Sequence, residues 1–166
     1  MPKVSVSRVI AAPQDQVWAA LADVANARRW NAAWHRIEIT TEQTHGTGTR
    51  FRAHTESGET FDFEVTSWVA PEFIAFSPIR DERERYGITL ESHAFRLQPA
   101  GEEETLVELI AHATARGVRG RFTALFFWPG YQKEGLNLAL DSLEALFTPR
   151  DQGNPESEPE ARPPAD

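Results

Sequence analysis

The feature that most constrains the fold is a run of short segments, between residues 35 and 115, in which apolar and polar residues alternate. Alternation with a period of two residues is typical of strands that are buried on one face. Turn-forming Gly, Pro and Ser residues separate the segments, so we expect one antiparallel sheet. The expected strands cover residues 35–42, 49–55, 59–68, 72–78, 85–98 and 104–115.

Further elements are expected on both sides of this run. A first strand is predicted at residues 3–10, and a helix follows that begins near Pro13, where the missing N–H of proline has no partner to lose. Asp23 can cap a second short helix at residues 24–30. A long helix, roughly residues 118–147, closes the domain. No parallel βαβ repeat is visible, so the predicted class is α+β, with about seven strands.

Length and charge narrow the classes of function. At 166 residues the chain most simply forms one domain. A formal net charge of -8 disfavours binding to nucleic acid and to an anionic membrane, so no nucleic-acid partner and no membrane contact are expected. There is no cysteine, which excludes a thiolate metal site and a cysteine nucleophile. The N-terminal residues lack the pattern of a secretory signal, and a cytoplasmic location is predicted.

The composition changes after Phe147. Residues 149–166 contain five of the eleven prolines and no aromatic residue. Such a segment cannot bury enough apolar surface to offset the entropy of ordering the chain. The predicted organisation is therefore a folded domain at residues 1–148 and a disordered, acidic, proline-rich tail at 149–166. The tail either only adds solubility or binds a protein partner, which the sequence leaves unknown.

The stretch "VSRVIAAPQDQVWAALADVANARRW" carries a resemblance to a known family. "GTGTRFR", "EVTSWVAPEFIAFS" and residues 85–115 match that family in kind and order, so the likeness covers about residues 3–147. The chain resembles the START and birch-pollen-allergen-like (SRPBCC) superfamily, specifically its polyketide cyclase/dehydrase-like branch. The motif indicates fold far more than function, because its residues are structural. In the first stretch these residues are Pro13, Val17, Trp18, Leu21, Asp23 and Trp30.

The resemblance implies a helix-grip fold, in which a curved antiparallel sheet wraps around the C-terminal helix. An apolar cavity between them would take a lipid, a polyketide or an aromatic compound. We favour the binding of such a hydrophobic small molecule. A cyclase or dehydratase reaction on it remains open, as does an interaction module in which an aromatic patch at residues 126–131 meets a protein or a membrane. No Gly-rich phosphate motif follows a strand and opens a helix, and no cofactor is expected.

The alternation also predicts which side chains face the cavity. Phe51, Phe61 and Phe63 fall on the apolar side of their strands, and charged residues alternate with them on the other side. Trp30 and Trp34, at a junction of helix and strand, either anchor the core or contact the ligand. The predicted ligand contacts are Trp30, Trp34, Phe51, Phe61, Phe63, Tyr86, Phe95, Leu109, Phe122, Phe126, Trp128 and Tyr131.

His93 and Glu91 are the candidate catalytic residues. If the last hairpin turns near Gly101, His93 lies opposite Leu109 and Glu91 opposite Ala111, so both point inward. His93 could then act as a general acid or base beside Glu91, contact a polar group of the ligand, or serve only structure. A bulge or a register slip would move both outside. The other histidines lack metal-like spacing, and no metal is expected.

The closing helix is predicted to kink or break at Pro129 and Gly130, because proline removes a hydrogen bond and glycine lowers helix propensity. The residues just before this point carry more apolar bulk than one helix face can bury. This bulk must meet the cavity, a partner or a membrane. We expect an aromatic gate at the cavity around Phe126, Trp128 and Tyr131. The alternative is that the aromatic side chains fill the cavity themselves.

Overall fold

The computed structural model describes residues 2–79 and 87–148. Within these residues seven strands form one antiparallel sheet in the order β1-β7-β6-β5-β4-β3-β2. The predicted α+β helix-grip fold is confirmed. The tail at 149–166 and Tyr86 lie outside the described residues. The strands are β1 (Lys3–Ile10), β2 (Arg36–Ile39), β3 (Arg50–His54), β4 (Thr60–Val69), β5 (Phe73–Pro78), β6 (Ile88–Pro99) and β7 (Thr105–Ala115).

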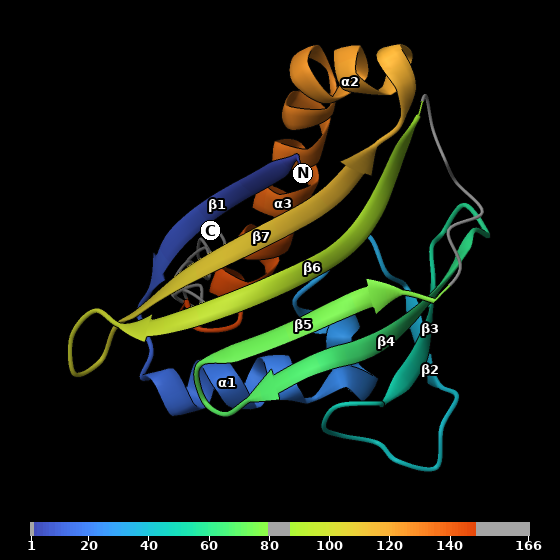
Figure 1. Cartoon of the computed structure of the whole chain (residues 1–166). Coiled ribbons are helices and arrows are strands. Elements are labelled where there is room, and N and C mark those ends of the chain that lie inside the picture. Colours follow the sequence, from blue (N-terminus) through green and yellow to red (C-terminus); the bar gives the residue numbers. More distant parts are fainter. Residues whose placement is uncertain (1, 80–86, 149–166) are drawn as a thin grey trace, which may run out of the picture.

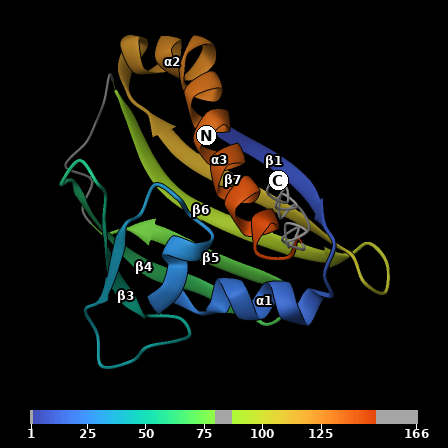
Figure 2. The ribbon, with the colours of Figure 1, turned by 180° about the vertical axis from the view of Figure 1, so that it is seen from behind.

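The helices lie on one face of this curved sheet, behind it in Figure 1 and in front of it in Figure 2. The helices are α1 (Gln14–Ala22), the 3-10 helix η1 (Val24–Arg29), α2 (Gly117–Phe126) and α3 (Trp128–Ala145). The predicted cap of η1 is not formed as expected. The Asp23 carboxylate accepts a hydrogen bond from the side chain of Asn26 at 2.8 Å and caps no backbone N–H.

Strands β3 and β4 have the two faces that the alternation predicts. Phe51 pairs with Phe63 on the concave face, where both side chains are buried. On the convex face the Arg52 guanidinium donates hydrogen bonds to both carboxylate oxygens of Asp62, at 2.7 and 3.1 Å. Mixed-sign ion pairs therefore cover the outer face, while aromatic side chains gather on the inner one.

The register of the hairpin between β6 and β7 differs from the prediction. His93 lies opposite Ala111, two residues from the predicted partner, so the side chain keeps its inward direction. A bulge at Glu91 separates Leu90 from Ser92 and turns the carboxylate to the outer face, where it accepts a hydrogen bond from Thr114. The prediction that Glu91 points inward is therefore wrong. Because one extra residue switches the alternation, Leu90 and His93 both face inward.

The closing helix is broken, as predicted, but two residues earlier than expected. α2 ends at Phe126, and α3 begins at Trp128, so Pro129 occupies the first turn of a new helix, where proline is well tolerated. Figure 1 shows α2 lying across the end of α3. Of α2 and α3, it is α3 that runs along the concave face of the sheet.

The C-terminal half of α3 is anchored to the sheet by apolar and charged contacts. Leu136, Leu140 and Leu143 are buried in the core. On the edge strand β1, the Arg8 guanidinium donates hydrogen bonds to Asp141 and, at 2.8 Å, to Glu144. These contacts fix the helix over the strands and so define the roof of the space beneath it.

Candidate ligand-binding cavity

A cavity of about 530 Å³ lies between the concave face of the sheet and the first half of α3. It opens to solvent along α3, where Tyr131 and Leu138 are exposed. The space is therefore accessible rather than a sealed void. Of the residues predicted to contact a ligand or to act in catalysis, eight line the cavity: Trp30, Trp34, Phe61, Phe63, His93, Phe95, Leu109 and Tyr131.

Aromatic rings form the floor of the cavity. Trp30 stacks on Phe76, with ring centroids 5.8 Å apart, and meets Phe95 edge to face at 5.2 Å. Trp34 meets Trp30 edge to face at 5.4 Å. Trp30 is only 1% exposed, so it serves the core and the cavity wall together. The aromatic side chains fill the deep part of the space and leave the cavity above them.

The roof comes from one stripe of α3. Tyr131, Gly135 and Leu138 lie three or four residues apart and line the cavity, as do Gln132 and Leu136 on the adjacent stripe. A Cβ atom added at Gly135 would meet no other atom within 4 Å. A larger side chain at this lining position would therefore meet no steric clash at its Cβ atom.

Gln132 and His93 form a polar pair in this mainly apolar lining. The Gln132 side-chain amide donates a hydrogen bond to Nε2 of His93 at 2.9 Å. Burial lowers the pKa of His93 from 6.5 to about 4, because the apolar surroundings disfavour the charged ring. The imidazole is therefore neutral at neutral pH. It can hydrogen-bond to a polar group of a bound molecule, but it is a weak base.

Several predicted site residues lie elsewhere. Phe51 and Trp128 are buried in the core. Phe122 and Phe126 project into solvent from α2, because the break at Phe127 leaves α2 at the end of the sheet and away from the cavity. Their predicted contact with the cavity is wrong. The predicted gate around Phe126, Trp128 and Tyr131 is wrong for the same reason, since of its three members only Tyr131 lines the cavity.

The sequence prediction missed most of the roof. The helical spacing from Tyr131 to Leu138 could have indicated a second stripe beside the buried leucines of α3. Gln132 and Gly135 are not apolar, so the hydrophobic pattern did not mark them. The bulge after Leu90 changes the alternation of β6, so the pattern did not assign Leu90 to the cavity. Among the described residues, no group of three His, Asp or Glu side chains is placed to hold a metal ion. The missed lining residues are Asn31, Ala33, Thr55, Phe76, Leu90, Gln132, Glu134, Gly135, Leu136, Leu138 and Ala139.

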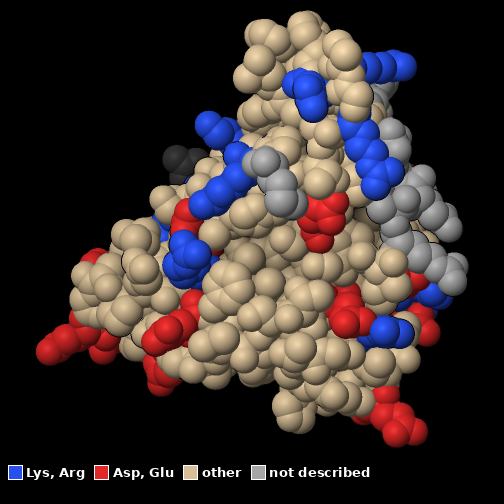
Figure 3. Space-filling view, in the orientation of Figure 1, with Lys and Arg blue, Asp and Glu red and all other residues tan. Residues whose placement is uncertain are grey.

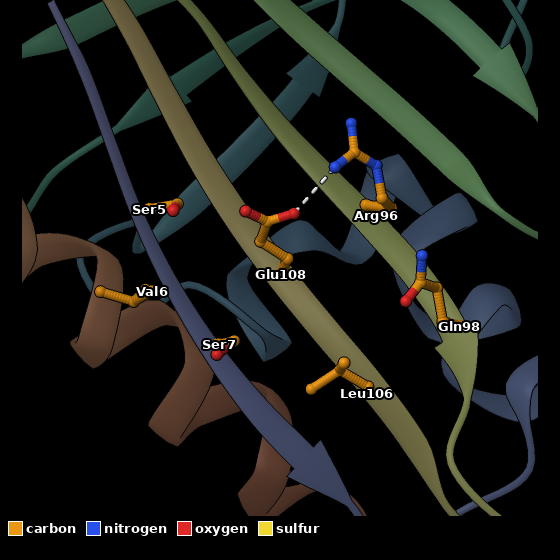
Figure 4. Close-up of a pocket in the computed structure, with 7 residues that line it drawn as sticks. All are labelled: Ser5, Val6, Ser7, Arg96, Gln98, Leu106 and Glu108. Carbon is orange, nitrogen blue, oxygen red and sulfur yellow. Dashed lines mark hydrogen bonds and ion pairs between the residues drawn. The ribbon is translucent and has the colours of Figure 1, made fainter.

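A second hollow, of about 240 Å³, lies on the convex face over β1, β7 and β6 (Figure 4). Ser5 and Ser7 border it, together with Arg96 and Glu108, whose side chains form an ion pair at 2.9 Å. Within residues 2–79 and 87–148, no helix covers this face of the sheet in Figures 1 and 2. The cavity beneath α3 is larger and mainly apolar, and it is therefore the better candidate site.

Fold and cavity together define a START-like protein of the SRPBCC class. Over residues 1–148 the chain matches the family described as polyketide cyclase / dehydrase and lipid transport, and it belongs to that family. No curated protein shows significant similarity to the chain.

Solved structures share the fold at low sequence identity. A Nitrosospira multiformis protein has a TM-score of 0.70 at 19% identity, over 89% of this chain and 97% of that one. A START superfamily protein from Mycobacterium smegmatis has a TM-score of 0.65 at 18% identity, over 87% and 96%. The di-domain ARO/CYC protein BexL has a TM-score of 0.67 at 19% identity, over 87% of this chain and 46% of its own. At these identities the likeness concerns the fold alone.

Proposed function

We propose that the protein binds a hydrophobic small molecule, without covalent chemistry, in the cavity beneath α3. The observation that carries the proposal is an open space of about 530 Å³ lined mainly by aromatic and aliphatic side chains. Small-molecule sites commonly measure roughly 300–1,000 Å³ and combine such a lining with a few polar groups. The family description, which includes lipid transport, supports the same function.

The lining favours a lipid, a polyketide or an aromatic compound that carries a polar group. The partly exposed rings of Trp34 and Phe61 offer flat contact area to apolar carbon. The neutral pair of His93 and Gln132 offers a hydrogen bond to a carbonyl or hydroxyl group. A cyclase or dehydratase reaction has less support, because Glu91 lies on the outer face and His93 has no carboxylate partner among the contacts described.

Filling the cavity from Gly135 tests the proposal directly. The variant Gly135→Phe places a ring where a Cβ atom meets no neighbour, and helical glycine is itself unfavourable by about 1 kcal/mol relative to alanine, so the protein should still fold. Nile red serves as an apolar fluorescent probe. We expect Gly135→Phe to weaken Nile red binding, measured by fluorescence titration, by about tenfold or more.

Gly130→Phe is the matched control. Gly130 is another α3 glycine at which an added Cβ atom would meet no other atom within 4 Å, and it does not line the cavity. This variant should bind Nile red like the wild type. Equal binding by all three proteins would contradict the proposal, as would a wild type that binds no Nile red.

A further inference from the structure

The surface of α2 and the first turn of α3 carries a cluster of large apolar side chains that face solvent. Their exposed fractions run from 56% to 87%. Folded proteins rarely leave such an apolar patch in water unless it meets a partner or a membrane. We define the α2 patch by its residues Val118, Phe122, Leu125, Phe126, Phe127 and Tyr131.

Close backbone packing holds α2 in this outward position. Gly120 of α2 lies against Gly87 at the start of β6, and a Cβ atom on Gly87 would come within 2.9 Å of the Gly120 Cα atom. The Arg116 N–H donates a hydrogen bond to the Gly87 carbonyl at 2.7 Å. Because two glycines allow this approach, α2 is fixed to the end of the sheet instead of folding over the cavity.

The charged residues within the segment that carries the patch are all positive. Arg116, Arg119, Arg121 and Lys133 are exposed, and no Asp or Glu occurs between residues 109 and 133. The whole chain has the opposite sign, with a formal net charge of -8. In Figure 3 the surface over α2 is tan and blue, whereas the red carboxylate atoms gather lower on the molecule.

We propose that the α2 patch docks on the surface of an anionic lipid membrane. A short helix with aromatic residues on one side and arginines beside them can lie in the headgroup layer, where its rings enter the acyl boundary and its cations meet lipid phosphates. None of the helices in the described residues has the length and composition to cross a membrane, so contact is confined to the surface.

The charge pattern favours a membrane over a second copy of this chain. In a symmetric dimer each patch would face itself, which brings the cations of one α2 against those of the other. The docking goes beyond the proposed ligand binding and does not require it. Tyr131 connects the two, because it belongs to the α2 patch and also lines the cavity. Docking would therefore place the cavity mouth near the lipid.

Vesicle co-sedimentation of the full chain tests the proposal. Vesicles of equal parts phosphatidylcholine and phosphatidylserine should bind the wild type about tenfold or more tightly than phosphatidylcholine alone, and added salt should weaken this binding. The double variant Phe126→Ala/Phe127→Ala should lose most of the binding. Arg116→Gln/Arg121→Gln should lose the preference for the anionic lipid. All four side chains are exposed, so both variants should fold.

Val69→Ala, which shortens an exposed apolar side chain on β4, is the control and should bind vesicles like the wild type. Nile red binding should be unchanged in every one of these variants, which separates failure of docking from failure of the cavity proposal. The docking proposal is overturned if the wild type does not sediment with anionic vesicles, or if the phenylalanine variant binds them equally well. A wild-type dimer that the phenylalanine substitutions convert to a monomer would also overturn it.

Discussion

The two helices that close the domain carry the same kind of apolar pattern, but α3 buries its apolar face and α2 exposes it. In α3, Leu136, Leu140 and Leu143 recur at helical spacing and pack on the sheet. In α2, Val118 and Leu125 belong to a similar stripe that faces solvent. Helical periodicity therefore indicates that a helix has an apolar face, but it does not identify what covers that face.

The break between the helices produces this difference. With Phe127 outside both helices, Pro129 starts a new helix whose direction is set by the sheet and by the Arg8 ion pairs. α2 is left attached through the contact of Gly87 with Gly120. Substitutions in α2, in α3 and at His93 test this difference between the two regions.

Truncating one leucine in each helix should give very different losses of stability. Leu140→Ala removes a fully buried side chain and should lower the free energy of unfolding by about 3 kcal/mol. Leu125→Ala removes an exposed side chain and should change it by no more than about 0.5 kcal/mol. Urea unfolding of both variants measures the difference. Similar losses would mean that α2 is buried in solution.

The free energy of unfolding should depend on pH through His93, which lines the cavity. Its pKa falls from 6.5 to about 4 in the folded protein, so between these values the unfolded chain binds the proton more readily. The contribution of neutral His93 is complete above pH 6.5 and is lost as the pH falls toward 4. At about 1.4 kcal/mol per pKa unit the loss is at most about 3 kcal/mol at the acid end, because solvent in the open cavity reaches the partly exposed ring.

Urea unfolding across this pH range, compared between wild type and His93→Gln, measures the contribution. The variant should show a shallower loss of stability on acidification. His112→Gln is the control, because His112 lies on β7 opposite Ser92 of β6 and does not line the cavity. Parallel pH profiles for wild type and His93→Gln would place the His93 ring in water.

A methyl group at Gly120 should disturb α2 more than its exposure suggests. The Cβ atom of Gly120→Ala would overlap the Gly87 carbonyl group, and such overpacking should lower the free energy of unfolding by about 2 kcal/mol. Gly130→Ala, which has free space, should be neutral or slightly stabilising. Urea unfolding distinguishes them. A fully stable Gly120→Ala variant would show that α2 is held less closely to β6.

Alternation predicted the sheet well because the strands bury mainly one face, although Ala75, Ala94 and Ile110 form a small second buried cluster. The strand bounds, the first helix and the break before α3 followed from local sequence. The site was predicted less completely. Glu91 is displaced by a bulge that no residue pattern announces, and Gln132 and Gly135 reach the cavity only through the position of α3. The net charge is a sum over the whole chain, so it gave no indication of the cationic segment at residues 116–133.

The pairing of β1 with β7 has a consequence for how the chain folds. Ile10 lies beside Thr105, and Arg8 reaches the last helix, so the first strand finds its neighbours only after almost the whole domain exists. Contacts this distant in sequence slow folding, since a long loop must close before they form. On the ribosome, β1 must wait unpaired while the other six strands emerge.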